Sequence, residues 1–230
     1  MTTSLRTDAA RNRAALVAAA REVMAERGLE APLDDIARQA GIGNATLYRR
    51  FPRRIDLIAA VFADRMADHA RAVQAALDAT DPWEGFCGYV EAAAELQVHD
   101  RGIADLITMD VSMAPEIEAL RDQAFHGLVK VIERAKAAGA LRADATPEDV
   151  VVILQANAGV VTRAHAAAAQ ASRRLIHVLL DGLRAEAATA GPSAPSPPRM
   201  RAAMRENSRR AGLLDQPNPA TSPPSDKEHS

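Results

Sequence analysis

A short basic stretch, GIGNATLYRRFPRR, holds the side chains of this chain that are best suited to binding a polyanion. It runs from Gly41 to Arg54. Between Arg38 and Arg54 there are five arginines and no acidic residue, together with a tyrosine and a phenylalanine. Arginine binds phosphate through paired hydrogen bonds, and short polar side chains can hydrogen-bond to base edges. The composition of this stretch therefore predicts contact with nucleic acid.

Two short helices are predicted on either side of the turn at Gly41–Gly43. The first, at about 33–40, follows a proline and has acidic residues in its first turn, where the helix dipole favours negative charge. The second, at about 44–50, ends before Pro52, which forces the preceding residue out of helical space. Two such helices form a helix-turn-helix, whose second helix fits the major groove of DNA.

The side chains of the second helix are suited to different parts of a DNA duplex. Asn44 and Thr46 are short and polar and lie at the N-terminal end, which reaches base edges first. The pair Arg49–Arg50 lies further along and can reach bases or phosphates. Tyr48 and Arg54 are placed to hold backbone phosphates, which fix the register without reading sequence.

The rest of the chain is also expected to be helical, so the predicted fold class is all-α. Alanine is abundant, aromatic residues make up 3% of the chain, and no alternating run of β-branched residues indicates a strand. An amphipathic helix is expected at 8–27. Further helices are expected at about 54–79, 83–98, 102–109, 115–138, 147–168 and 171–188, which gives about nine in all.

Three features occur in order over about fifty residues: AA…MAERG, DDIARQAGIG and TLYRRFPRR…L. With them, the sequence from Arg13 to Phe62 resembles the N-terminal DNA-binding domain of the tetracycline-repressor (TetR) family of bacterial regulators. The resemblance implies that Thr46, Tyr48 and the basic pair after it lie near DNA, and that Leu47 and Phe51 belong to the core.

The match to the family pattern is incomplete at three positions. Arg54 stands where the family usually has lysine, Arg50 where histidine is more frequent, and Ala45 where glycine is common. These differences leave the operator sequence open. The expected DNA contacts are Asn44, Ala45, Thr46, Tyr48, Arg49, Arg50 and Arg54.

Charge and composition divide the chain into three parts. Residues 1–60 hold ten basic and seven acidic residues, whereas residues 61–189 hold twelve basic and nineteen acidic ones. Eight of the thirteen prolines lie after residue 190. We expect a DNA-binding domain at 8–54 with its helix-turn-helix at about 31–50, a helical effector-binding and dimerisation domain at 55–189, and a disordered Pro/Ser-rich tail at 190–230.

The resemblance also implies a homodimer that reads a palindromic operator. One helix-turn-helix module buries too little surface for tight binding, so two modules related by a two-fold axis are expected. The dimer surface is assigned to the last two helices, at about 147–188, which have broad apolar faces. Intrachain core is the alternative for these faces, whose residues are Val151, Leu154, Val161, Leu175, Val178, Leu179 and Leu183.

The acidic part resembles the ligand-sensing domain of the family, and its few large side chains could line a cavity. Methionine and aromatic residues suit adaptable pockets, although they also fill cores. Asn157 and His165 interrupt an apolar helix and could anchor a ligand or be satisfied interior residues. The candidate residues for a small apolar or amphipathic effector are Phe62, Met66, Phe86, Tyr89, Met109, Met113, Phe125, Asn157 and His165.

These observations favour a dimeric repressor that a small molecule releases from its operator. A regulator without ligand response and an activator are the alternatives. An enzyme is disfavoured: Glu91, Glu95 and His99 share a helical face, but the second copy needed for a di-iron site is missing. No catalytic residue, metal site or cofactor is expected. One cysteine, the lack of a long apolar run and the lack of a signal peptide indicate a cytoplasmic protein.

Overall fold

The computed structural model describes residues 2–110 and 115–213, and every regular element in these two ranges is helical. The prediction of an all-α fold is confirmed. The α-helices are α1 (Thr2–Arg27), α2 (Leu33–Gln39), α3 (Asn44–Arg50), α4 (Arg54–Asp78), α5 (Pro82–His99), α6 (Arg101–Thr108), α7 (Pro115–Ala137), α8 (Pro147–Ala164), α9 (Ala168–Leu183) and α10 (Pro197–Arg210). The first nine correspond to the helices expected from the sequence.

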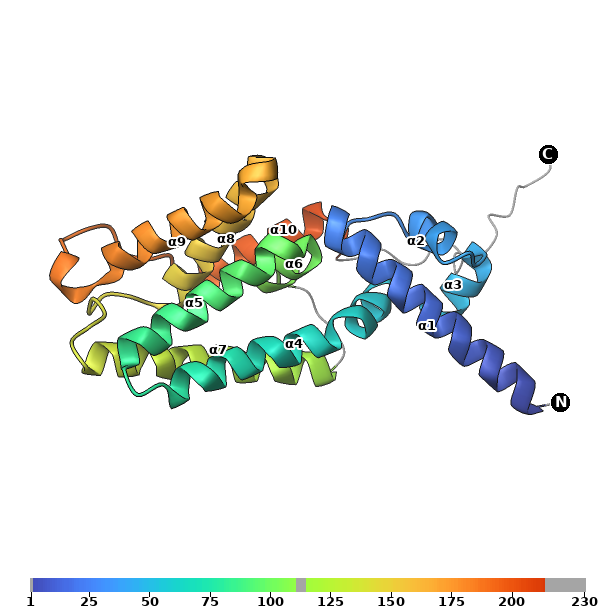
Figure 1. Cartoon of the computed structure of the whole chain (residues 1–230), viewed down its shortest axis with the longest axis horizontal. Helices are drawn as coiled ribbons and strands as arrows, with labels where there is room; N and C mark the ends of the chain where they lie inside the picture. Colours follow the sequence, from blue (N-terminus) through green and yellow to red (C-terminus); the bar gives the residue numbers. More distant parts are fainter. Residues whose placement is uncertain (1, 111–114, 214–230) are drawn as a thin grey trace, which may run out of the picture.

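The molecule is elongated, with α1–α3 at one end and a bundle formed by α4–α9 at the other (Figure 1). We call these parts the head and the body. Helix α4 leads from the head into the body, where it packs along α7 and α5. The head has its own core, centred on Leu16, Ile36, Leu47 and Leu57, and α6 contributes Ile103 and Leu106 to it. The head core thus includes residues far beyond the sequence limit expected for this domain.

The turn between α2 and α3 is held by backbone hydrogen bonds. Gly41 has φ +65°, a conformation that glycine adopts without strain. The N–H of Gly41 donates to the carbonyl of Arg38 at 3.1 Å, and that of Ile42 donates to the carbonyl of Ala37 at 3.0 Å. This pattern is a Schellman motif, which ends α2 and fixes the direction in which α3 leaves.

Helix α6 joins the body to the head at the end of α1. Asp105 accepts a hydrogen bond from the backbone N–H of Leu29 at 2.9 Å. Gly28, with φ +84°, makes room for this contact, because a Cβ there would lie 2.5 Å from the Asp105 carboxylate. Burial raises the pKa of Asp105. The head is therefore attached to the body through α6 as well as through α4.

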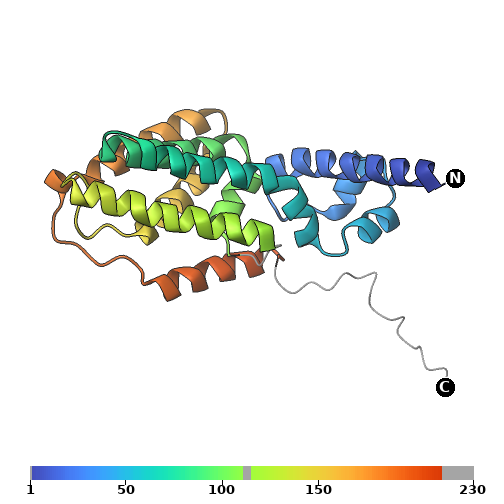
Figure 2. The same ribbon diagram turned by 90° about the horizontal axis from the view of Figure 1, so that it is seen from below.

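Helix α10 differs from the disordered tail that the sequence led us to expect over 190–230. Pro197 and Pro198 occupy its first turn, where the missing N–H groups cost nothing, so two of the prolines that indicated disorder start a helix. Met200 is 6% exposed, and Ser208 donates to the carbonyl of Asp110 at 2.8 Å. Figure 2 shows α10 lying along the body at the end nearest the head. Residues 214–230 lie outside the described ranges.

Helices α8 and α9 fold back on each other at His165, which has φ +48°. The segment Pro147–Leu183 passes as a membrane-spanning helix by length and composition, but it consists of these two separate helices. Only 22% of its most apolar window is buried within the chain. Val152 and Val178 are 42% and 47% exposed. The pair of helices therefore presents apolar side chains on the outside of the body.

Candidate functional site

The outer face of α3 is open, and its inner face is anchored in the head core. Leu47 is 1% exposed and Phe51, just after the helix, is 3% exposed. The side chains expected to meet DNA lie on the other face: Asn44, Ala45, Arg49 and Arg50 are exposed, and Thr46 and Tyr48 are half-buried. The helix is thus held by its apolar residues with its polar edge toward solvent.

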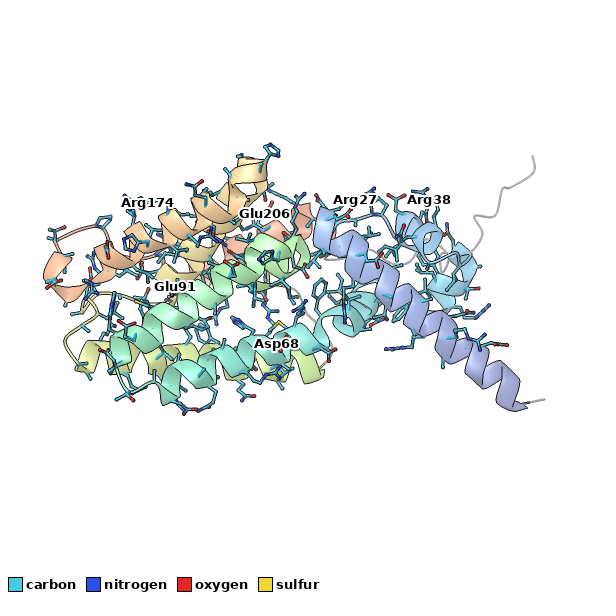
Figure 3. All side chains as sticks on the ribbon, viewed as in Figure 1. Arg27, Arg38, Asp68, Glu91, Arg174 and Glu206 are labelled. Atoms are coloured by element: carbon cyan, nitrogen blue, oxygen red, sulfur yellow. The ribbon has the colours of Figure 1, made fainter. Side chains whose placement is uncertain are left out.

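Several charged side chains around α3 already have partners. Arg53 forms an ion pair with Asp56 at 2.6 Å and belongs to the capping box of α4. Arg38 pairs with Asp35, and Asn44 donates to Asp34 at 2.8 Å. Figure 3 places Arg27 and Arg38 at the head end of the molecule and Glu91 and Arg174 on the body. Among the described residues Arg50 has no hydrogen bond or ion pair, so its charge is available to an incoming anion.

Arg54 has a structural role that the sequence did not predict. Its Nη1 donates to the carbonyl of Leu29 at 2.9 Å and to the carbonyl of Ala31 at 2.6 Å. Burial lowers its pKa, although nearby Tyr48 and Glu30 act in the opposite direction. Arg54 therefore ties the start of α4 to the loop after α1. The expected phosphate contact would have to use its remaining N–H groups.

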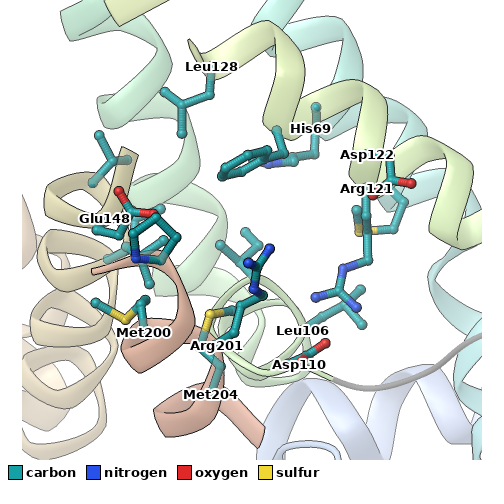
Figure 4. Close-up of a pocket in the computed structure, with 18 of the residues that line it drawn as sticks. His69, Leu106, Asp110, Arg121, Asp122, Leu128, Glu148, Met200, Arg201 and Met204 are labelled. Atoms are coloured by element: carbon teal, nitrogen blue, oxygen red, sulfur yellow. The ribbon is translucent and has the colours of Figure 1, made fainter. Parts of the chain in front are cut away.

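A cavity of about 270 Å³ lies in the body beside the head (Figure 4). Helices α4, α5, α6, α7, α8 and α10 all contribute side chains to its wall. Its apolar surface includes Met66, Leu106, Leu128 and Leu154. Acidic side chains also line it, among them Asp110, Asp122 and Glu148, and two arginines, Arg121 and Arg201, face the same space.

Three of the effector residues expected from the sequence line this cavity: Met66, Tyr89 and Phe125. Five others do not. Phe62 belongs to the head core, where its ring lies so close to Gly102 that a Cβ at that position would clash with it. Phe86 packs against Trp83 in the body core. These two aromatic rings lie in cores because of how distant helices pack. The sequence pattern of a core ring is the same as that of a ring in a cavity wall.

The remaining expected effector residues are placed elsewhere for other reasons. Met109 caps α6, and its carbonyl accepts from Arg121 at 2.9 Å. Asn157 is fully buried and donates to Gln97 at 2.8 Å, so it links α8 to α5. His165 is exposed at the break between α8 and α9. Met113 lies outside the described residues.

His69 is one of several cavity residues that were not expected from the sequence. It is 8% exposed, lines the cavity, and lies 3.4 Å from the hydroxyl of Tyr89 through its Nε2. Burial lowers its pKa to about 4. It follows Met66 by three residues on α4 and so shares that residue's helical face. That spacing could have indicated its position, but not its partner on α5.

The described residues hold no group of three or more His, Cys, Asp and Glu side chains that could bind a metal ion. His99 Nε2 lies 3.0 Å from Glu95, and both side chains are largely exposed. Glu91 is exposed as well. This helical face is solvated.

Two family models match the chain, one in the head and one in the body. The model for bacterial regulatory proteins of the tetR family matches residues 16–61, and the model for the SbtR-like transcriptional regulator C-terminal domain matches residues 81–185. A TetR transcriptional regulator of Streptomyces coelicolor is 31% identical in sequence, over 75% of this chain and 98% of that one, with a TM-score of 0.46. The chain belongs to the TetR family. It is therefore a DNA-binding transcriptional regulator by family.

Other TetR-family structures are similar to this one. A TetR regulator of Mycobacterium vanbaalenii is 30% identical, over 78% of this chain and 99% of the other, with a TM-score of 0.43. FadR of Bacillus subtilis, solved in complex with stearoyl-CoA, is 16% identical over 74% of this chain and 98% of its own, with a TM-score of 0.54. The last comparison supports the TetR fold. No curated protein matches the chain significantly.

Proposed function

We propose that this TetR-family protein is a dimeric repressor that a small molecule releases from a palindromic operator. The observation that carries the proposal is a cavity whose walls include both helices that attach the head, α4 and α6. Helix α4 contributes Met66 and His69 to the cavity and begins at Arg54, which binds the head. Helix α6 contributes Leu106 to the cavity. The residue before it, Asp105, accepts the hydrogen bond from the Leu29 N–H in the head.

A ligand in this cavity would contact both helices that attach the head to the body, α4 and α6. If the ligand binds one arrangement of α4 and α6 more tightly, it shifts the population toward that arrangement. In a dimer, this shift changes the separation of the two α3 helices, which have to match half-sites about one helical turn apart. Operator affinity then falls by at most the ratio of the ligand's affinities for the two states.

The DNA contacts that we propose follow from the exposed face of α3. Asn44 and Thr46 lie at its N-terminal end, where base edges come within reach. Arg49 and Arg50 reach bases or phosphates, and Ala45 allows close approach of the backbone. Tyr48 and Arg54 contact phosphates. A protein that binds chromosomal DNA in this way would be located in the bacterial cytoplasm.

The second proposed interface is between two copies of α8 and α9. Val178 is 47% exposed, and Leu175 and Leu179 are half-buried on the same helix. Of the other residues expected in the dimer face, Leu154 lies in the body core and lines the cavity, and Val151 lines the cavity. Exposed apolar side chains of this kind are stabilised by burial against a second subunit.

Selection of binding sites from random DNA duplexes tests the proposal. A dimeric reader should enrich an inverted repeat, and Asn44→Ala or Thr46→Ala should change the preferred bases without abolishing binding. An enriched single half-site would contradict a dimeric reader.

The same duplex then serves in a release assay. Binding to it that no ligand of the cavity weakens would favour the alternative, a regulator without ligand response. Transcription from a promoter that contains the enriched site separates repression from activation.

A further inference from the structure

One wall of the cavity contains a buried polar pair, His69 on α4 and Tyr89 on α5. Their rings are tilted, with centroids 5.6 Å apart, and Tyr89 is 4% exposed. The Tyr89 hydroxyl lies 3.4 Å from His69 Nε2. Within the described part of the chain, His69 Nδ1 has no hydrogen-bond partner although the atom is buried. A buried polar atom without a partner in a cavity wall indicates a ligand that supplies one.

The partner that Nδ1 requires depends on which ring nitrogen carries the proton. If the Tyr89 hydroxyl donates to Nε2, the proton is on Nδ1, and Nδ1 is the one polar atom of the pair left unsatisfied. If Nε2–H donates to Tyr89 instead, both the hydroxyl hydrogen and Nδ1 lack partners. An unpaired buried donor or acceptor is costly, so the first arrangement is favoured. Nδ1 is then a donor that needs an acceptor.

The apolar side chains that share the cavity wall with this donor favour an uncharged ligand group. The cavity wall that contains His69 also includes the apolar side chains of Met66, Leu106 and Leu128. A charged group buried there without an opposite charge would lose its hydration at a large cost. The charged side chains that line the cavity come from α7, α8 and α10 and the end of α6, and they include both signs.

We propose that His69 Nδ1–H is the hydrogen-bond donor for the effector, and that the effector is an uncharged, mostly apolar molecule with a carbonyl, ether or hydroxyl oxygen. The oxygen accepts from Nδ1, and the apolar remainder contacts Met66, Leu106, Leu128 and Leu154. This proposal rests on the proposed function of the cavity as the effector site.

The tautomer of His69 can be tested without any ligand. Long-range proton–nitrogen correlation spectra of histidine-labelled protein at neutral pH distinguish Nδ1–H from Nε2–H, and the variant His69→Phe assigns the signals. We expect the Nδ1–H tautomer in the full chain and a mixture in Tyr89→Phe, which removes the hydroxyl and keeps the ring. An Nε2–H tautomer or a charged imidazole in the wild type overturns the proposal.

Four probes with similar carbon chains then test the ligand class: methyl hexyl ketone, octane, octanoate and octylamine. Calorimetric titration should show the ketone binding most tightly, and His69→Phe should weaken the ketone by roughly tenfold while octane is unchanged. Octane binding as tightly as the ketone, a preference for either ion, or no binding of any probe overturns the proposal. A ketone that binds but leaves the protein on its operator contradicts release and supports the ligand class, so the two proposals are separable.

Helix α10 carries a second inference, because it lies beyond both regions that match the family models and still forms part of the cavity wall. Met200, Arg201 and Met204 line the cavity from this helix. Figure 4 shows the Arg201 side chain projecting into the cavity, on the side opposite His69. Without α10 this side of the cavity would be open to solvent.

The polar contacts that hold α10 on the body go to Asp110, and Met200 is a buried apolar side chain of the same helix. Arg205 forms an ion pair with Asp110 at 2.8 Å, and Ser208 donates to the carbonyl of the same residue. The helix has five arginines and one glutamate. The body on which it lies is acidic, with Asp110, Asp122 and Glu148 along the cavity. Opposite charges therefore favour docking, and exposed ion pairs of this kind are weakened by salt.

We infer that α10 is a mobile wall of the effector site, which opens to admit the ligand and encloses it when docked. The apolar contacts of Met200 and Met204 with a bound ligand would add to the docking energy. Ligand binding and α10 docking should therefore stabilise each other.

Hydrogen exchange of the α10 amides tests this second inference in the full chain. Arg205→Asp replaces the ion pair with repulsion of Asp110, and we expect α10 to exchange roughly fivefold to tenfold faster. The double variant Arg205→Asp with Asp110→Arg should restore slow exchange. Arg210→Asp is the matched control, because Arg210 pairs only with Glu206 of the same helix among the described residues.

Methyl hexyl ketone should slow the exchange of α10 in the wild type, and higher salt should accelerate it. Equal exchange in Arg205→Asp and Arg210→Asp would show that docking on Asp110 does not hold α10. Exchange of α10 that is unaffected by bound ketone would overturn its role as a wall of the site.

Discussion

Because His69 is uncharged in the folded protein, it makes the free energy of unfolding depend on pH. Burial lowers the pKa of His69 from 6.5 to about 4. Above pH 6.5, the pKa of histidine in the unfolded chain, His69 is neutral in both the folded and the unfolded state. Between pH 6.5 and about 4, only the unfolded chain binds the proton. Stability is therefore lost as pH falls through this window, by about 3 kcal/mol in total. Urea unfolding at a series of pH values should show this loss in the wild type and its absence in His69→Phe. A wild type and variant with parallel pH profiles would contradict it.

Arg54 joins two segments of the head, and its removal should affect folding before it affects DNA. Arg54→Ala leaves the carbonyls of Leu29 and Ala31 without the donor that now satisfies them. We expect a loss of about 2 kcal/mol in the free energy of unfolding, since hydrogen bonds from a charged donor are among the stronger ones. Thermal and urea unfolding measure it.

Arg53→Ala is the control for Arg54→Ala, because the exposed Arg53 side chain contacts Asp56 in the first turn of α4, and alanine keeps the backbone N–H that donates to Asp56. It should change stability by less than about 0.5 kcal/mol. If Arg54→Ala is as stable as this control, the two carbonyl contacts are not structural. A phosphate role for Arg54 is a separate matter, and a lower salt slope of DNA binding in stably folded Arg54→Ala, with the slope kept in Arg54→Lys, would support it.

At the scale of the elements, the contact between α6 and the end of α1 depends on an acceptor rather than on a charge. Asp105→Asn keeps an oxygen for the Leu29 N–H, whereas Asp105→Ala leaves this buried donor unpaired. We expect the alanine variant to lose about 1–2 kcal/mol and the asparagine variant to lose little. Unfolding measurements on both variants check this, and equal losses would show that the carboxylate charge matters.

The same pair of variants has a defined pH dependence. Burial raises the pKa of Asp105, so the folded state binds the proton more tightly than the unfolded state. The stability that this group contributes is present at low pH and is lost as pH rises through the folded pKa. Asp105→Asn removes that loss, so its stability relative to the wild type should rise from acidic to neutral pH.

Helix positions were largely predictable from the sequence, because helix signals are local. Apolar periodicity, the glycine at the turn and the proline after α3 indicated α2 and α3 to within a residue or two. Helix α10 was missed for a related reason. Prolines at this density are typical of disorder, whereas two of them stand in the first turn of a helix whose Met200 and Ser208 are buried against a distant part of the chain.

At the scale of the whole molecule, we expect the exposed apolar face of α9 to hold a dimer. Val178→Asp places a charge on that face and should weaken dimerisation by roughly tenfold to a hundredfold, the equivalent of losing the burial of about half a valine side chain in each subunit. Sedimentation equilibrium measures the association. Ala75→Asp, on exposed surface of α4, is the control. An unchanged dimer in Val178→Asp would move the interface away from α9.

The sequence by itself determined the all-α fold and the helix-turn-helix with its polar edge. These depend on residues a few positions apart, where periodicity, turn glycines and charge runs act directly. The tertiary structure decided which large side chains face the cavity, that His69 meets Tyr89 there, and that α10 forms part of its wall. It also gave Arg54 its partners, 25 and 23 residues earlier in the chain. Contacts between such distant residues depend on how whole helices pack, because a buried methionine or aromatic ring has the same local pattern in a core as in a cavity wall.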